Sequence, residues 1–236
     1  MIKLTSFSII LTLGSCASAP TTELNTWGSM KTVLAQGKTA ARIALADAIT
    51  PHSVGIGALA GLEGELTILD GVIHAARVTP NYALTSTKLT GSQTDDSATL
   101  LAICEVAEWE TVLLGEVSSL SALETIVAAE LIDRGFDMTR PVPFKVETTF
   151  SEISIHVLNN SCPIANPDGP EPWRGHFNTK NGHLVGLYAV GFGGELTHHG
   201  SDSHIHAIVL DGDVVNSSGH AESFALEPGS ILYLPK

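Results

Sequence analysis

The chain has 236 residues, of which 44% are hydrophobic and only 16% are charged, so a disordered chain is excluded and one large or two small domains fit the length. Twelve basic and 25 acidic side chains give a formal net charge of −13, and no basic run attracts nucleic acid or an anionic membrane surface. We therefore expect no nucleic-acid partner, whereas a small anionic substrate stays compatible if a metal ion inverts the local field.

The first 16 residues have the pattern of an export signal. Lys3 precedes the short apolar run Phe7–Leu13, and Leu13-Gly14-Ser15-Cys16 resembles a bacterial lipobox, in which the cysteine is lipidated after cleavage. Residues 17–26 are predicted to form a flexible tether outside the fold. The protein is therefore expected outside the cytoplasm, either secreted or anchored to the cell envelope through the lipid on Cys16 alone.

Two further cysteines, Cys104 and Cys162, remain after Cys16 is used. Outside the cytoplasm they can pair as a disulfide. Cys104 lies in an apolar stretch, however, where a buried free thiol fits equally well. The sequence leaves both states open.

The first part of the folded chain, residues 27–140, is predicted to combine a sheet with helices. Apolar spacing over Trp27–Thr50 indicates helical pieces, and Val54–Ile73 has short apolar runs around glycine turns that are typical of a three-stranded meander. Thr85–Ser97 is polar and is predicted to be a loop, and Leu100–Leu114 a strand. A serine cap and a closing glycine predict a helix over residues 118–135, with an apolar side formed by Leu123, Ile126, Val127, Leu131 and Ile132.

The second part, residues 141–236, is predicted to consist mainly of strands. They are expected at Phe144–Leu158, Gly182–Val190, Ile205–Leu210 and, once or twice, within Glu222–Leu234, with a proline-rich connection over Ser161–Gly175. Few helices and many strands together indicate an α+β fold with a dominant antiparallel or mixed sheet.

Five of the ten histidines fall between residues 198 and 220. His204 and His206 are two residues apart on a predicted strand, so their side chains point to the same face, and His220 can return as a third ligand after a turn. Three neutral imidazole nitrogens with an open position are the pattern of a catalytic zinc site. The competing interpretation is a polar strand edge with unrelated histidines.

Several short motifs resemble those of the bacterial α-acetolactate decarboxylases, in family order, over about residues 27–235. They are Gly61–Gly71, Thr149-Phe150-Ser151, Asn181–Gly186, His204-Ile205-His206 and Ser218-Gly219-His220. The resemblance implies an α+β fold with two related halves, frequently a homodimer, and one Zn²⁺ on His204, His206 and His220. It also implies conversion of 2-hydroxy-2-methyl-3-oxobutanoate (2-acetolactate), a small hydroxy-keto acid, to acetoin and carbon dioxide.

Glu65 matches an acidic residue of the family and is the candidate acid/base group, although its position in a hairpin also fits a surface carboxylate. The family has an arginine near the end of the strand that contains Thr149, where this chain has His156 or a neighbour. His156 is the candidate replacement, without the bidentate fork of a guanidinium. The spacing from His206 to His220 is longer than usual, and only Lys236 follows Leu234-Pro235, where the family usually has an acidic tail with a further site glutamate.

These departures leave more than one function open. The first is zinc-dependent decarboxylation of 2-acetolactate, and the alternative is a metal-binding or small-molecule-binding member that has lost or changed the reaction. A third is chemistry on another hydroxy-keto acid, with His156 or His199 reshaping the site. DNA binding, a property suggested by related small domains, is the last, because both the negative charge and the export signal disfavour it.

Overall fold

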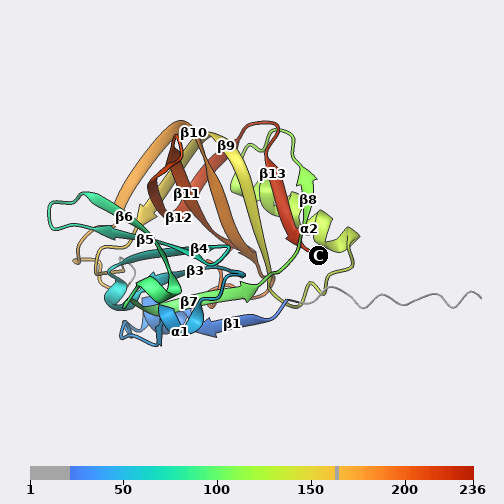
Figure 1. Ribbon diagram of the computed structural model, residues 1–236. Helices are drawn as coiled ribbons and strands as arrows, with labels where there is room; N and C mark the ends of the chain where they lie inside the picture. Colours follow the sequence, from blue (N-terminus) through green and yellow to red (C-terminus); the bar gives the residue numbers. More distant parts are fainter. Residues whose placement is uncertain (1–21, 163–164) are drawn as a thin grey trace, which may run out of the picture.

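The computed structural model describes residues 22–162 and 165–236, so the predicted signal sequence 1–16 with Cys16 and most of the predicted tether lie outside the described residues. The described chain forms two antiparallel sheets that pack against each other (Figure 1). The first has the strand order β1-β7-β3-β4-β5-β6 with β2 beside β7; its strands are β1 (Leu24–Trp27), β2 (Ile43–Ala44), β3 (Ser53–Leu59), β4 (Gly64–Leu69), β5 (Val72–Val78), β6 (Leu84–Thr90) and β7 (Ser97–Glu105).

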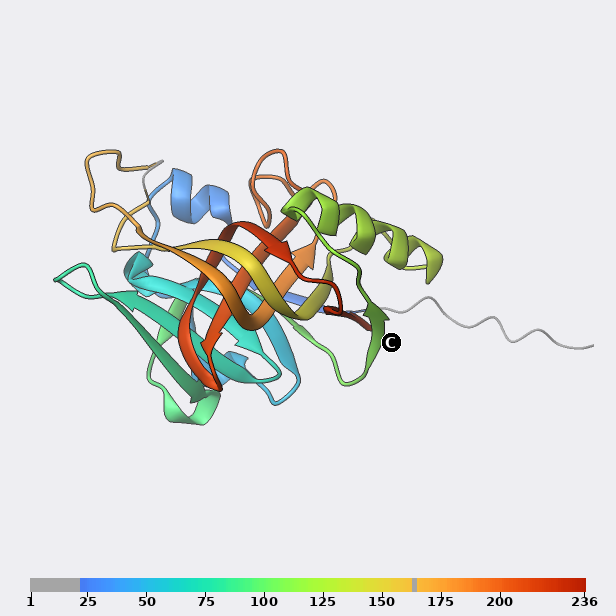
Figure 2. The ribbon, with the colours of Figure 1, turned by 90° about the horizontal axis from the view of Figure 1, so that it is seen from above.

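The second sheet has the order β10-β11-β12-β9-β13-β8. Because β10 also pairs with β9, the strands β9 to β12 close into a ring of hydrogen-bonded neighbours, seen end-on in Figure 2. Its strands are β8 (Trp109–Leu113), β9 (Val142–Val157), β10 (Trp173–Tyr188), β11 (Ser203–Asp211), β12 (Val214–Leu226) and β13 (Ile231–Pro235). The α+β fold dominated by antiparallel sheet is therefore confirmed.

One long helix, α2 (Leu120–Asp133), covers the second sheet. Ser119 caps it by accepting a hydrogen bond from the Ala122 amide at 3.2 Å. The residues that it buries against the core are Leu123, Val127 and Leu131, whereas Ile132 is 61% exposed because it lies about 100° around the helix from Leu131. Among the described residues no helix is long and apolar enough to cross a membrane. The remaining helical pieces are the π-helical turn η1 (Lys31–Ala35), α1 (Leu45–Ala48), η2 (Ala60–Leu62) and η3 (Gly91–Gln93).

The division of the chain differs from the predicted one in two places. Strand β8 pairs with β13, and α2 packs on the core of the second sheet, so the change from one sheet to the other lies between Glu105 and Trp109 rather than at residue 140. Residues 24–26, predicted to be tether, belong to β1 and pair with β7. A polar edge strand such as β1 has too little apolar alternation to be separated from a linker by sequence alone.

Two predicted elements also need correction. The helical pieces predicted over Trp27–Thr50 are present as η1 and α1, with the short strand β2 directly before α1. The predicted loop at Thr85–Ser97 is wrong, because Leu84–Thr90 is β6, an edge strand with mostly polar and exposed side chains. The strand predicted over Leu100–Leu114 is divided into β7 and β8, which belong to different sheets. The meander from β3 to β5, the helix α2 and strands β9, β11 and β13 lie where the apolar periodicity predicted them. Two strands begin earlier than predicted, β10 at Trp173 and β12 at Val214 rather than at Glu222.

Two glycines of β10 allow the second sheet to pack its aromatic core. A Cβ atom at Gly186 would lie 2.4 Å from the Phe144 ring, and one at Gly182 would lie 2.7 Å from the Phe150 ring and 2.1 Å from the Ile208 carbonyl oxygen. Both phenylalanines are almost completely buried. Strand β10 therefore lies closely against β9 and β11, which sets the position of the histidines on those strands.

Cys104 and Cys162 are free buried thiols, so the disulfide that the sequence left open does not form in this structure. Burial raises the pKa of the Cys104 thiol to about 12, with the neighbouring Glu105 adding to the shift. A thiol with this pKa stays protonated at neutral pH and is a packing residue rather than a nucleophile.

His74 on β5 makes folding stability depend on pH. It is 4% exposed, its Nδ1 has no partner among the described residues, and burial lowers its pKa from 6.5 to about 4, with Lys88 and His183 adding to the shift. Between these two pH values the unfolded chain binds a proton that the folded chain does not, so the free energy of unfolding falls as the pH drops through this window.

The contribution of His74 can be measured by comparing wild type with His74→Phe. The free energy of unfolding of each protein is determined by denaturant titration at pH 7 and at pH 5. We expect wild type to lose about 2 kcal/mol more unfolding free energy than the variant over that interval. The other buried histidines titrate in both proteins and cancel in the comparison. Equal losses in the two proteins would contradict the assignment.

Candidate metal centre

Three histidines lie in one row across the second sheet. His206 on β11 is directly opposite His220 on β12, which in turn is directly opposite His156 on β9. Directly opposite residues of antiparallel strands share a face, so all three imidazoles project to the same side. The ring centroids are 5.6 Å apart for His206 and His220 and 4.8 Å apart for His156 and His220.

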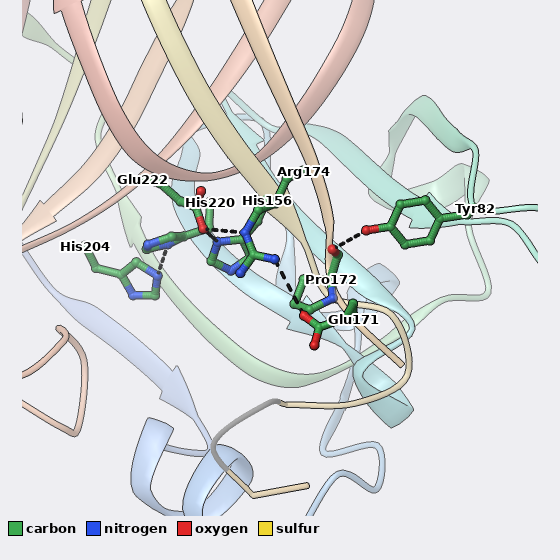
Figure 3. Close-up of polar contacts among 8 residues, drawn as sticks. All are labelled: Tyr82, His156, Glu171, Pro172, Arg174, His204, His220 and Glu222. Carbon is green, nitrogen blue, oxygen red and sulfur yellow. Dashed lines mark hydrogen bonds and ion pairs between the residues drawn. The ribbon is translucent and has the colours of Figure 1, made fainter. Parts of the chain in front are cut away.

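His204 completes a compact group with this row. It lies two residues before His206 on the same face of β11, and its Nδ1 donates a hydrogen bond to the Leu196 carbonyl at 2.8 Å. That bond leaves Nε2 of the neutral ring as an acceptor. This Nε2 lies 3.1 Å from Nδ1 of His220. Figure 3 marks the contact between the two rings with a dashed line.

A fourth imidazole comes from the loop between β10 and β11. This residue is His198. Its ring offers one nitrogen that lies within 4.8 Å of a ring nitrogen of His204 and of one of His220, and the latter two lie within the same distance of each other. The sequence pattern placed His198 outside the ligand set, because the loop has no periodicity from which to infer its direction. In the described part of the chain no hydrogen bond orients the His198 ring.

His206, on the second sheet, contacts two side chains of the first sheet. The Nδ1 atom of His206 lies 3.3 Å from the Thr67 hydroxyl, and its Nε2 lies 3.8 Å from a carboxylate oxygen of Glu65. Glu65 and Thr67 are both on β4 of the first sheet and are both buried. The first sheet therefore closes the histidine group from the opposite side, and Glu65 is not a surface carboxylate.

Burial keeps these histidines neutral. It lowers the pKa of His204 to about 3, and it lowers the pKa values of His206 and His220 well below 6.5, with mutual repulsion between the rings adding to each shift. The pKa of His198 is also lowered by burial. Neutral imidazoles present lone pairs, which is the form that binds a metal ion.

The residues present fit a zinc ion. Two imidazole nitrogens on one tetrahedral Zn²⁺, at about 2.0–2.1 Å each, lie about 3.3 Å from each other, and the facing nitrogens of His204 and His220 are 3.1 Å apart. Histidine ligands also usually have their second nitrogen held by a hydrogen bond. The Nδ1 contacts of His204 with Leu196 and of His206 with Thr67 match this requirement.

Glu65 differs from the histidines in the direction of its shift. It is 5% exposed, and burial raises the pKa of its carboxyl group well above 4.5, although a backbone hydrogen bond with Leu158 opposes the shift. A carboxyl group whose pKa is raised by burial is better suited to donate a proton inside an apolar site than an exposed one.

At the end of the histidine row, His156 contacts a pair of charged side chains. Its Nδ1 lies 3.0 Å from an Oε1 of Glu222, and Nε of Arg174 donates to the same oxygen at 3.3 Å (Figure 3). Arg174 also lies 3.7 Å from Glu171, and its Cα is paired directly with that of His156 across β9 and β10. Burial lowers the pKa of His156 while Glu222 opposes the shift.

The start of β10, and with it Arg174, is fixed by a contact from the first sheet. The Tyr82 hydroxyl, in the turn between β5 and β6, donates to the Pro172 carbonyl at 2.6 Å (Figure 3). Sequence reasoning missed Arg174 and Glu222, because a search along β9 alone finds no arginine near His156. The signal that identifies Arg174 is strand register, which needs the pairing of β9 with β10.

Comparisons with known proteins identify the family and the fold of this chain. A family model described as alpha-acetolactate decarboxylase matches residues 28–233. The crystal structure of alpha-acetolactate decarboxylase from Bacillus subtilis strain 168 is similar at a TM-score of 0.68 with 18% identity, covering 90% of this chain and 85% of that one. A Staphylococcus aureus protein of unknown function, described as similar to alpha-acetolactate decarboxylase, has a TM-score of 0.65 with 16% identity and covers 90% of this chain and 85% of its own. A search of curated protein sequences finds no match.

Proposed function

The chain belongs to the alpha-acetolactate decarboxylase family, and on that basis we propose that it is a metal-dependent lyase that converts 2-acetolactate to acetoin and carbon dioxide. The observation that carries the proposal is the enclosure of neutral, closely spaced histidines by a buried carboxyl group from the opposite sheet, whose pKa is raised by burial. Zinc is the proposed ion, because neutral imidazole nitrogens are among its preferred ligands.

His204, His206 and His220 are the proposed ligands. His204 and His220 face each other at 3.1 Å, so both belong to any ligand set at this position. For the third place, His206 is favoured over His198, because the Thr67 hydroxyl is in reach of its second nitrogen and because its ring is fully buried. A ring without an orienting contact loses more side-chain entropy on binding an ion.

The reaction needs a place for negative charge and a proton for carbon. The bond between the carboxylate carbon and the hydroxyl-bearing carbon breaks, its electron pair moves towards the neighbouring carbonyl oxygen, carbon dioxide leaves, and the hydroxyl-bearing carbon takes up one proton. When bound, the ion supplies Lewis acidity for the substrate oxygens. Glu65 is the proposed proton donor, because burial raises its pKa and it lies beside His206 within the cavity.

His156 and Arg174 are the proposed groups for the substrate carboxylate side. His156 lines the same cavity as the other histidines, and Arg174 is a permanent cation whose guanidinium reaches the carboxylate that holds His156. Glu222 therefore positions His156 and is itself neutralised by Arg174. In this arrangement the cation comes from β10, the neighbour of the strand on which the family resemblance places an arginine.

The first test is reconstitution of the full chain with Zn²⁺, followed by an assay of acetoin and carbon dioxide formed from 2-acetolactate. Stoichiometric zinc with product formation supports the decarboxylase. Bound zinc with unchanged acetolactate would instead favour a metal-binding or small-molecule-binding member of the family. One feature favours this alternative, since the Arg174 guanidinium is already engaged by Glu222 and Glu171.

We predict that Glu222→Gln lowers kcat/KM by about 10–100-fold, the usual cost of removing a group that orients a site residue. The amide removes the charge that pairs with both His156 and Arg174. Glu171→Gln is the matched control, since Glu171 contacts Arg174 at 3.7 Å and has no contact with His156 among those found in the described residues. The ¹⁵N chemical shifts of the His156 ring report its tautomer independently of turnover, and an unchanged tautomer in Glu222→Gln would contradict a positioning role.

The proposed location is outside the cytoplasm, with the protein held at the cell envelope through a lipid on Cys16 or secreted. The support is the sequence of residues 1–16, which lie outside the described residues. We predict that Cys16→Ser moves the protein from the membrane fraction to the soluble fraction. The substitution removes the sulfur to which the lipid is attached, and with it the proposed membrane anchor. Fractionation and metabolic labelling with a fatty acid measure this, and equal membrane content of the two proteins would contradict it.

A further inference from the structure

The cavity around the histidines is too small for a whole substrate. Its volume is about 40 Å³, and it is lined by residues that include Glu65, His204, His206 and His220. At about 10–15 Å³ for each enclosed water, this space holds about three water molecules. Even a small hydroxy-keto acid must therefore extend beyond it, with only its reacting atoms next to the histidines.

A larger cavity lies directly beside it. This second cavity has a volume of about 480 Å³, within the range of small-molecule sites. Met30, Leu34 and His198 line both cavities, so these side chains form the boundary between them. The two cavities are therefore neighbours that share these side chains.

Two segments from opposite parts of the chain build the second cavity. One is η1 with the preceding Met30, and the other is the loop between β10 and β11 that provides His198. They are joined by a hydrogen bond from the Met30 amide to the Glu195 carbonyl at 3.0 Å. Figure 2 shows η1, in blue, and this loop, in orange, on the same side of the molecule.

The lining of the second cavity is mostly without charge. Met30, Leu34, Ala35, Gly193 and Gly194 contribute it, whereas the charged side chains of Lys31 and Glu195 are exposed. Gly194 is needed for the space itself, because its φ is +81° and a Cβ atom there would lie 2.7 Å from the His199 ring. An apolar chain therefore fits this cavity better than a second charged group.

We infer that the substrate class of this protein is a 2-hydroxy-3-oxo acid with an alkyl substituent longer than the methyl group of acetolactate, and that the cavity beside Met30, Leu34 and His198 binds this substituent. The inference rests on the proposed function, and it leaves the bond that breaks and the proton that is taken up unchanged. Each methylene that enters the cavity is expected to improve binding by about fourfold, the usual effect of burying one such group.

The test is a binding series that does not depend on turnover. The probes are 2-hydroxy-2-methyl alkanoic acids of increasing chain length, which have no ketone and cannot decarboxylate, titrated into the zinc-loaded full chain by calorimetry. In wild type the dissociation constant is expected to fall by about fourfold per added methylene until the cavity is filled. A dissociation constant that does not change with chain length would overturn the inference.

Two cavity-filling variants locate the effect, and a matched variant controls for a surface tryptophan. Ala35→Trp and Gly193→Phe each fill the second cavity, whereas Ala40→Trp adds the same bulk at an exposed position outside it. The chain-length dependence is expected to disappear in the first two and to persist in Ala40→Trp. If it persists in all three, the chain binds elsewhere and the inference fails.

Turnover of the corresponding 2-alkyl-2-hydroxy-3-oxo acids separates this inference from the proposed function. A rise in kcat/KM with chain length in wild type supports both. Decarboxylation without any chain-length preference would overturn the inference and leave the proposed function in place. Chain-length-dependent binding without decarboxylation of any member would support the cavity assignment and reject the decarboxylase.

Discussion

His204→Ala is expected to lose its bound metal ion and, with it, the decarboxylation of 2-acetolactate. His204 is buried, its Nδ1 is fixed by the Leu196 carbonyl, and its Nε2 faces His220 at 3.1 Å. Loss of a group that only orients a ligand usually reduces metal affinity by about 10–100-fold. Removal of a ligand itself should reduce the affinity further. Elemental analysis after dialysis, together with the acetoin assay, measures both effects.

His176→Ala serves as the control for removing a histidine, because His176 is exposed on β10 and contacts Ser154 rather than the histidine group. Its metal content and activity should equal those of wild type. A His204→Ala protein that still holds one equivalent of zinc would disprove the site. Comparison of His206→Ala with His198→Ala then identifies the third ligand, and we expect the larger loss of zinc from His206→Ala.

Glu65→Gln is expected to retain zinc while kcat falls by about 10²–10⁴-fold, the usual contribution of a general acid or base. The amide occupies nearly the same volume in the buried space beside His206 but cannot deliver a proton to carbon. Metal content and kcat measured on the same sample separate the loss of a proton donor from the loss of the ion.

Glu63→Gln is the matched control for this substitution. Glu63 precedes the same strand by one residue but is exposed, so its replacement should change neither zinc content nor kcat. If Glu65→Gln retains full activity, the proton comes from another group and the proposed role of Glu65 is wrong. If Glu65→Gln instead loses its zinc, the carboxyl group acts on the ion rather than on the substrate.

Local pattern was sufficient for the strands and the long helix that carry strong periodicity. The buried stripe of Leu123, Val127 and Leu131 repeats every four residues, and β9 alternates along its length, so both elements were predictable. Local pattern failed at β1 and β6, which are edge strands of the first sheet. An edge strand is stabilised mainly by its backbone hydrogen bonds to one neighbour. Its sequence therefore need not show the alternation of apolar and polar residues by which a strand is recognised.

The sequence by itself determined that the chain has an α+β fold with an antiparallel sheet and that His204 and His206 share a face, because both follow from residue spacing along a single strand. Only the tertiary structure decided which other groups meet them. Strand register places His220 opposite His206 and Arg174 opposite His156, and the packing of the two sheets brings Glu65 to the histidines. Register and sheet packing depend on residues far apart in the chain, and no spacing along one strand specifies them.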